Sequence, residues 1–366
     1  MNSFIILGLD IGGANTKAAL VKFQSDIILE SFSYIEYFPF WEKNLDDIQN
    51  MLKRIVKNLI VKNDFNLEKD INFISITTTA ELSDAFQTKK EGILLILESL
   101  ENIFEKEKLF FINKEAKFIN FEYTKKEPIS IAAANWVSTS LFLGQFISQC
   151  ILIDAGSTTI DLIPILNKIP VAKGKDDISR LINHELIYTG GLRATIPSIT
   201  HFVEYKGKKI RISFEKFALI SDVHLILNNI SEDEYVNDTA DNRSKSLENC
   251  YSRLARIICM DIETISREEL DSIANFIYNK QISIIIKEIE KFYKNLIKNY
   301  PEFKRNPNFV ITGLSAKFLI QPSLEKLGYH NINYYKKITN IPDNISSSAF
   351  AVAGALYFQI KEKEKK

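Results

Sequence analysis

The first glycine pair of the chain stands between two apolar segments of strand length. Residues 4–10 (FIILGLD) are nearly all apolar and end at Asp10, and residues 17–23 (KAALVKF) resume the apolar pattern after a short link. A glycine-rich loop of the Rossmann type must instead open a helix. We therefore expect a β-hairpin that turns at Gly12 and Gly13, and we exclude a dinucleotide-binding fingerprint.

The same pattern returns near the middle of the chain. Residues 150–166 (CILIDAGSTTIDLIPIL) contain an apolar strand that ends at Asp154, a turn with Gly156 and small hydroxyl residues, and an alternating strand. Asp154 follows Asp10 by 144 positions (154 minus 10). We therefore predict an internal duplication of one domain type.

Composition limits the partners and the compartment. The 366 residues suit two domains, and 46 basic residues balance 46 acidic ones, so no chain-wide basic field exists for nucleic acid or an anionic membrane. Three cysteines without a CxxC and four histidines without metal-ligand spacing argue against a structural zinc. No apolar run has the length of a membrane helix, and the start lacks a signal-peptide pattern. We expect a cytoplasmic protein.

The rest of the chain alternates between helical and strand patterns. Helical spacing of apolar residues predicts helices at 45–60, 91–104, 128–146, 246–265, 273–300 and 346–363. Strands are expected at 27–37, 71–82, 116–121 and the start of 306–320. We place an N-terminal domain at 1–148 and a C-terminal domain at 149–366, with an irregular insertion at about 167–249. Most of the polar run 228–246 is expected to be a solvated loop.

The two glycine turns are candidate phosphate sites. Backbone N–H groups in tight turns form concave anion sites, and a carboxylate at each strand end can hold Mg²⁺. Each turn alone is equally well an ordinary glycine turn. Candidate substrate- and phosphate-binding residues are Gly12, Gly13, Asn15, Thr16, Lys17, Asn135, Trp136, Gly156, Ser157, Thr158, Thr159, Arg193 and Gly313.

Eight segments in order resemble a known family: GLDIGGANTKAA, TTTAELSDAFQTKKEGI, AAANWVSTS, DAGSTTIDLIPI, ELIYTGGLRA, SDVHLILNNISEDEY, TADNRSK and RLARIICMD. The turns resemble those of the actin/sugar-kinase/Hsp70 superfamily. The segments resemble its hydantoinase A/oxoprolinase branch and, within it, the archaeal methanofuran-biosynthesis synthases once described as tetrahydromethanopterin-linked C1-transfer proteins. The family carries Gly where this chain has Asn242 and Ser315, and Thr where it has Ala194.

The resemblance implies an α/β fold of two ribonuclease-H-like (actin-like ATPase) domains, with mixed sheets flanked by helices and a cleft between them. It also implies a transferase that joins γ-glutamyltyramine to an aminomethylfuran diphosphate and releases diphosphate. The phosphates would then belong to the furan, with Mg²⁺ on Asp10 or Asp154 and no organic cofactor. The phenol needs a base, for which Glu81 is the first candidate and Asp84 and Asp161 follow. The partners would be these small molecules, without nucleic acid or membrane; a homodimer is left open.

Plainer interpretations stand beside these. Glu81 and Asp84 are also suited to cap the next helix, Arg193 to form a surface ion pair rather than a phosphate clamp, and Trp136 to sit in the core. Residues 239–243 form either a lid or a mobile loop. Other open functions are an ATP-dependent small-molecule kinase, a hydantoinase- or oxoprolinase-like hydrolase, and a non-catalytic ATP-gated module like an Hsp70 nucleotide domain.

Overall fold

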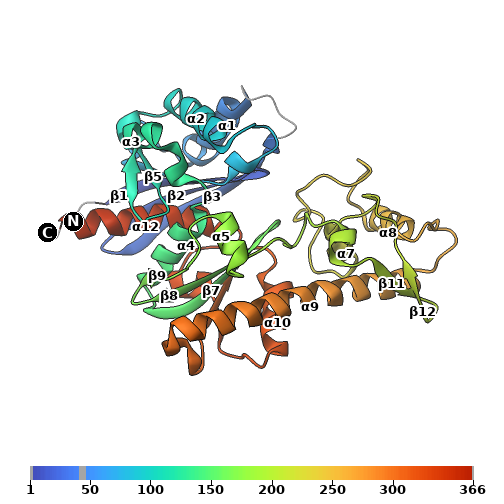
Figure 1. Ribbon diagram of the computed structural model, residues 1–366. Coiled ribbons are helices and arrows are strands. Elements are labelled where there is room, and N and C mark those ends of the chain that lie inside the picture. The colour runs from blue at the N-terminus through green and yellow to red at the C-terminus, as the bar shows by residue number, and fades with distance from the viewer. Residues whose placement is uncertain (1–2, 41–46, 365–366) are drawn as a thin grey trace. The chain divides into compact units, whose positions relative to one another are not determined.

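The computed structural model describes residues 3–40 and 47–364, and its helices and strands are drawn in Figure 1. The described residues form two compact units. The first lies within Met1–Leu152, Ile163–Ile182 and Asn333–Lys366, and the second comprises Ile153–Leu162 and Asn183–Ile332. Because these units follow contacts rather than chain order, the boundary expected between residues 148 and 149 stays a prediction.

The first sheet confirms the expected hairpin. Its strands lie in the order β3-β2-β1-β4-β5-β6. β1 is antiparallel to β2 and parallel to β4. The strands are β1 (Phe4–Ile11), β2 (Asn15–Gln24), β3 (Ile27–Tyr37), β4 (Phe73–Thr78), β5 (Leu109–Ile112) and β6 (Phe118–Asn120).

Both faces of β1 are covered, which explains its nearly continuous apolar pattern. On one face, Leu7 and Leu9 belong to a core shared with α1 (Asp47–Leu59) and α2 (Lys89–Glu101). On the other face, α12 (Ser347–Glu364) packs against β1 and β2. Figure 1 shows α12 and the α1–α2 pair on opposite sides of the strands.

The second sheet repeats the strand order of the first. Its order is β10-β8-β7-β13-β14, with β9 paired to β8. In both sheets the first strand of the hairpin is central, and its partner and a third strand lie to one side. Later strands lie to the other side, three in the first sheet and two in the second. This confirms the predicted repeat. The strands are β7 (Gln149–Ala155), β8 (Ile160–Leu166), β9 (Ile169–Pro170), β10 (Leu186–Ile187), β13 (Phe309–Thr312) and β14 (Ile332–Tyr334).

The remaining elements connect and cover these sheets. The α-helices are α3 (Phe121–Lys126), α4 (Asn135–Gly144), α5 (Asp177–Ile182), α6 (Ile196–Ile199), α7 (Ile220–Ile226), α8 (Leu247–Arg256), α9 (Arg267–Asn299), α10 (Gln321–Lys326) and α11 (Tyr335–Thr339). Single turns are η2 (Val61–Asn63), η3 (Ala80–Leu82), η4 (Lys106–Lys108), η5 (Pro128–Ile131), η6 (Pro301–Lys304) and the π-turn η7 (Ala316–Ile320). None of the helices within residues 3–40 and 47–364 is long and apolar enough to cross a membrane.

Two predicted helices are shorter than expected, and a third is described only in part. The segment 128–146 breaks at residues 132–134, where Ala133 has a left-handed φ of 52°. The segment 246–265 is helical only to Arg256. Of the helix expected at 45–60, residues 45 and 46 lie outside the described residues.

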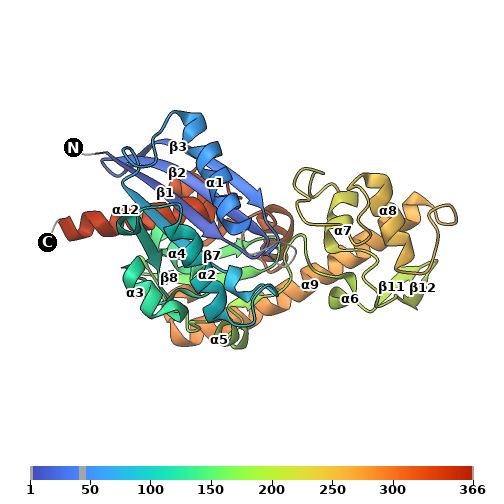
Figure 2. The same ribbon diagram turned by 90° about the horizontal axis from the view of Figure 1, so that it is seen from above.

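The residues from α6 to α8 (196–256), here called the α6–α8 module, belong to the second unit. They include the hairpin of β11 (Phe202–Tyr205) and β12 (Lys208–Arg211). α6, α7, α8 and β11 pack on the 33-residue helix α9, and Figure 2 shows these elements gathered along one part of α9.

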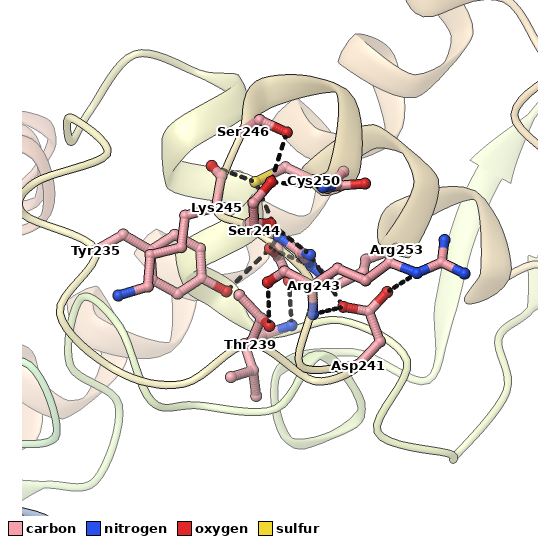
Figure 3. A network of polar contacts seen from close by, with 12 residues as sticks. Tyr235, Thr239, Asp241, Arg243, Ser244, Lys245, Ser246, Cys250 and Arg253 are labelled. Atoms are coloured by element: carbon pink, nitrogen blue, oxygen red, sulfur yellow. Dashed lines mark hydrogen bonds and ion pairs between the residues drawn. The ribbon is translucent and has the colours of Figure 1, made fainter.

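The polar run 228–246 lies in this module, and the expectation of a solvated loop is wrong for its central part. Tyr235 is fully buried and donates its hydroxyl to Asp222. Arg253, also fully buried, pairs with Asp222 at 2.7 Å and with Asp241 of the loop at 3.1 Å. Figure 3 shows this network, which also includes Arg243 through its own pair with Asp241. The loop is therefore fixed to α8 by buried polar contacts.

Candidate functional site

The two glycine turns have the same hydrogen-bonded closure. Gly12 donates its N–H to the carbonyl of Asn15 at 3.1 Å, and Gly156 donates to the carbonyl of Thr159 at 2.9 Å. Gly156 follows Gly12, and Thr159 follows Asn15, by the same 144 positions that separate Asp154 from Asp10. We call residues 12–15 the first loop and residues 156–159 the second loop.

Two N–H groups of the first loop, those of Ala14 and Asn15, point away from the neighbouring segment that supports the loop. The carbonyls of Gly13 and Ala14 accept the N–H groups of Phe40 and Phe38 at 3.0 and 2.9 Å. In a trans peptide the C=O and the following N–H point in opposite directions, and the described residues contain no cis peptide. The N–H groups of Ala14 and Asn15 therefore point away from residues 38–40.

The second loop repeats this arrangement with three peptides. The carbonyls of Gly156, Ser157 and Thr158 accept backbone N–H groups of residues 190–193 at 2.9–3.1 Å. By the same geometry, the N–H groups of residues 157–159 all point away from residues 190–193. Successive N–H groups turned to one side form a typical anion site.

Glycines allow the supporting backbone to approach the second loop this closely. A Cβ on Gly190 would lie 2.6 Å from the backbone of Ser157 and Thr158. A Cβ on Gly313, which has a φ of 89°, would lie 2.3 Å from the carbonyl oxygen of Ala155 and 2.8 Å from Asp154. Ser315 donates its backbone N–H to the same carbonyl oxygen at 3.0 Å. Gly190 was missed by sequence reasoning, although the glycine pair in YTGG was its signal.

Asp10 lies on the face of the first sheet that α12 covers. Its Oδ2 accepts the Ser348 hydroxyl at 2.5 Å, in the first turn of α12, where the helix dipole favours a negative charge. Thr77 and Lys17 are its register partners on β4 and β2. Asp10 is buried, and its Oδ1 has no hydrogen-bond partner among the described residues. Ser348 lies 338 positions away, and no local pattern pointed to it.

Other candidates of the first loop also carry unsatisfied oxygens. Thr16 is buried and Asn15 is half-buried, and the structure gives neither Thr16 Oγ1 nor Asn15 Oδ1 a partner among the described residues. Buried polar atoms are normally hydrogen-bonded. The unsatisfied oxygens of Asp10, Asn15 and Thr16 at the end of the β1–β2 hairpin, together with the outward N–H groups of the first loop, therefore indicate a place for a polar ligand.

Glu81 is a buried carboxyl group with one oxygen engaged and one free. It lies in η3, just after β4, and only 2% of its surface is exposed. Its Oε1 accepts the backbone N–H of Ala133 at 2.8 Å, while its Oε2 has no partner within the described residues. Burial raises the pKa of Glu81 to about 7, against the opposing effect of hydrogen bonds from the backbone of Glu81 itself and of Ala133. A carboxyl group that titrates near neutrality suits acid–base catalysis.

The two charges that act on the pKa of Glu81 belong to one ion pair. Lys89, the first residue of α2, lies 3.5 Å from Asp177 of α5. Lys89 lowers the pKa of Glu81 and Asp177 raises it, each by less than burial does. The alternative of Glu81 or Asp84 as a helix cap is wrong, because Thr88 caps α2 by accepting the Glu91 N–H.

The remaining candidates are spread over both units. Asp84 is exposed and Asp161 is buried on β8. Trp136 is buried beneath the guanidinium of Arg180, 4.6 Å from the ring centre. Asn135 begins α4, and Arg193 follows the glycine pair that supports the second loop. Their roles in binding stay predictions.

A magnesium ion fits the donor set at Asp10. Mg²⁺ is usually held by one or two carboxylates together with phosphate oxygens and waters, and Asp10 Oδ1 is a buried carboxylate oxygen without a partner in the described part of the chain. Within that part, no group of three or more His, Cys, Asp or Glu residues is placed to hold a metal. Asp10 lies in the first unit and Asp154 in the second.

Comparison with known proteins identifies the family. A family model described as hydantoinase/oxoprolinase matches residues 73–359. The chain belongs to the hydantoinase/oxoprolinase family. This confirms the resemblance seen in the eight ordered segments.

Two relatives in this family share one name. A (4-{4-[2-(γ-L-glutamylamino)ethyl]phenoxymethyl}furan-2-yl)methanamine synthase from Methanocaldococcus jannaschii is 34% identical over 357 residues, 97% of this chain and 98% of that protein. The synthase of the same name from Methanococcus vannielii is 31% identical over 226 residues, 60% of this chain and 98% of that protein.

The fold of this family member is also found among solved structures. A nucleotide-free acetone carboxylase structure matches with a TM-score of 0.54 and 12% identity, over 96% of this chain and 70% of that one. At this identity the match concerns the fold alone. Together with the repeated strand order it confirms the predicted actin-like α/β fold.

Proposed function

We propose that this chain is a transferase of methanofuran biosynthesis. It joins the phenol of γ-glutamyltyramine to the CH₂ carbon of [5-(aminomethyl)furan-3-yl]methyl diphosphate. The observation that carries the proposal is the 34% identity to the M. jannaschii synthase over nearly the whole of both chains. The name of that relative describes a phenoxymethyl-furan ether, which is the product of this reaction.

The proposed reaction is a displacement at carbon. The phenol oxygen forms a bond to the furan CH₂, the bond from that carbon to the diphosphate oxygen breaks, and diphosphate leaves with the bonding electrons. The furan ring oxygen stabilises positive charge on the CH₂ carbon, so the main task of the protein is to stabilise the departing diphosphate. The outward N–H groups of residues 157–159 are suited to that task.

Glu81 is the proposed base. A phenol has a free pKa of about 10, so its proton must pass to an acceptor as the new bond forms. The unpartnered Oε2 of Glu81 supplies an acceptor, and a pKa of about 7 places the proton affinity of this carboxylate close to working pH. Its other oxygen is held by Ala133, which fixes the carboxylate plane.

Asp10 is the proposed residue for Mg²⁺. The ion would neutralise charge on phosphate oxygens when bound. Ser348 orients the carboxylate through Oδ2 and leaves Oδ1 available. Lys17, beside Asp10 on β2, is suited to attract the same negative charge.

The test is to incubate the purified chain with γ-glutamyltyramine, the furan diphosphate and Mg²⁺ in the absence of ATP. We expect equal amounts of the ether and of inorganic diphosphate, measured by mass spectrometry and a diphosphate assay. Absence of the ether would contradict the proposal. Formation of a phosphorylated substrate together with ADP, only when ATP is added, would favour a small-molecule kinase of the same fold.

A further inference from the structure

The second loop is connected to the α6–α8 module by a chain of buried polar side chains. His224 of α7 and Gln281 of α9 are both fully buried. The imidazole Nε2 of His224 lies 3.0 Å from Gln281 Oε1. The Nε2 of Gln281 donates to the carbonyl of Gly190 at 3.0 Å and to the Thr189 hydroxyl at 3.1 Å.

The partners fix the direction of every hydrogen bond in this chain. The amide Nδ2 of Asn229, 3.1 Å from His224 Nδ1, can only donate, so Nδ1 accepts and the ring proton is on Nε2. Nε2 then donates to Gln281 Oε1, which leaves both Nε2 protons of Gln281 for Gly190 and Thr189. Burial lowers the pKa of His224 to about 3, so the ring stays neutral and keeps this tautomer.

The last acceptor in this series of hydrogen bonds, the Gly190 carbonyl, belongs to the segment 190–193 that holds the second loop. Gly190 donates its N–H to Thr158, and Gly191 donates to Gly156. The N–H of Gly190 thus fixes the peptide between Thr189 and Gly190. The carbonyl of Gly190, which accepts from Gln281, fixes the peptide between Gly190 and Gly191. A shift at Gln281 is expected to move residues 190–193 and, with them, the N–H groups of residues 157–159.

We infer that His224 and Gln281 are positioning residues for diphosphate binding at the second loop. Neither touches the loop directly; both act through the Gly190 carbonyl. The inference rests on the proposed function, because it takes the group bound by the second loop to be the diphosphate. It adds a role for the α6–α8 module, which supplies His224 and Asn229 and so holds the phosphate site in its binding form.

The test measures affinity for inorganic diphosphate with Mg²⁺ by isothermal titration calorimetry on the full chain. Gln281→Met leaves the Gly190 carbonyl and the His224 N–H without partners, and we expect at least about tenfold weaker binding. His224→Leu should weaken binding similarly, whereas His224→Gln, which keeps a donor toward Gln281, should restore it to within about twofold. The controls are Ile285→Met, at a buried position of the same helix, and His330→Gln, at an exposed histidine; both should bind as wild type.

A steady-state measurement separates positioning from general damage. In Gln281→Met we expect the KM for the furan diphosphate to rise while the KM for γ-glutamyltyramine stays unchanged. A merely structural role would reduce the active fraction and leave both KM values unaltered, which would overturn the inference. If Gln281→Met does not fold, Gln281→Glu keeps the side-chain length and the acceptor for His224 but loses both donors, and it should show the same loss of affinity.

The outcomes distinguish this inference from the proposed function. Wild-type affinity for diphosphate in folded Gln281→Met or Gln281→Glu would overturn the positioning role alone. Failure of the wild-type chain to bind diphosphate would overturn the assignment of the second loop, and the positioning role with it.

Discussion

Glu81 and Ala133 lie 52 positions apart, and the backbone N–H of Ala133 donates to the carboxylate Oε1 of Glu81 at 2.8 Å. The contact depends on the left-handed φ of Ala133, which interrupts the helix expected over residues 128–146. A helix break in an alanine-rich segment is unfavourable by itself. Here it provides the hydrogen bond that orients a buried carboxyl group.

Replacement of Glu81 tests its role as the base. Glu81→Gln keeps the shape of the side chain but cannot take a proton, and we expect kcat to fall by about 10²- to 10⁴-fold. In the wild type kcat should rise with pH through about 7, because only the ionised carboxylate accepts the proton. The control is Glu98→Gln on the exposed face of α2, which should retain full activity. A Glu81→Gln variant with wild-type kcat would exclude Glu81 as the base.

The raised pKa of Glu81 also predicts a pH-dependent stability. The folded chain holds this proton up to about pH 7, whereas an unfolded glutamate loses it near 4.5. The stabilisation by the protonated form is complete below pH 4.5 and is lost as pH rises through about 7, a change of roughly 3 kcal/mol. The difference in unfolding free energy between wild type and Glu81→Gln should shift by that amount between pH 4 and pH 8.5 in denaturant titrations. A pH-independent difference would contradict the raised pKa.

The close approach of Gly190 to the second loop predicts that this glycine is required for binding. In Gly190→Ala the new Cβ would meet loop backbone at 2.6 Å, so the loop must move. We expect diphosphate affinity to fall at least about tenfold, through loss of aligned N–H donors. Gly328→Ala is the matched control: it also introduces strain, at a φ of 81°, but nothing lies within 4 Å of the new Cβ. Its stability should fall by about 1 kcal/mol with affinity unchanged.

Asp10 should determine the response to Mg²⁺. We expect Asp10→Asn to reduce kcat/KM by about 10²-fold or more and to raise the Mg²⁺ concentration needed for half-maximal activity, because an amide oxygen is a weaker ligand than a carboxylate. Asp64→Asn, at an exposed turn, should change neither value. An unaltered Mg²⁺ response in Asp10→Asn would place the ion elsewhere.

The buried ion pair in the α6–α8 module predicts a large effect on stability. Arg253→Leu removes the ion-pair partner of the buried Asp222 carboxyl group, which costs about 3–5 kcal/mol. Arg267→Leu removes an exposed pair with Glu248 and should cost less than about 1 kcal/mol. Chemical denaturation measures both. Limited proteolysis should cleave residues 228–246 in Arg253→Leu faster than in the wild type.

Local patterns in the sequence predicted much of this architecture. The apolar strands around each glycine turn, the repeat between Asp10 and Asp154, and the periodic helices α1, α2 and α12 all depend on neighbours within one element. The prediction that both turns bind an anion rests on glycine and hydroxyl residues at fixed positions.

The parts that were missed depend on contacts between distant residues. The helix break at Ala133 is compensated by Glu81, and helix propensity alone favours a continuous helix there. Ser348 reaches Asp10 from the far end of the chain. Tyr235 stands in a strongly polar run, but it is buried because its hydroxyl donates to Asp222, which is paired with Arg253. No periodicity in the sequence marks such a position.

The most direct measurement of the central claim follows the phenol oxygen. γ-Glutamyltyramine labelled with ¹⁸O at the phenol is incubated with the furan diphosphate, Mg²⁺ and the chain without ATP, and the products are analysed by mass spectrometry. Displacement at the furan carbon predicts that all label appears in the ether and none in the released diphosphate. Label in phosphate, or no ether under these conditions, would contradict the account.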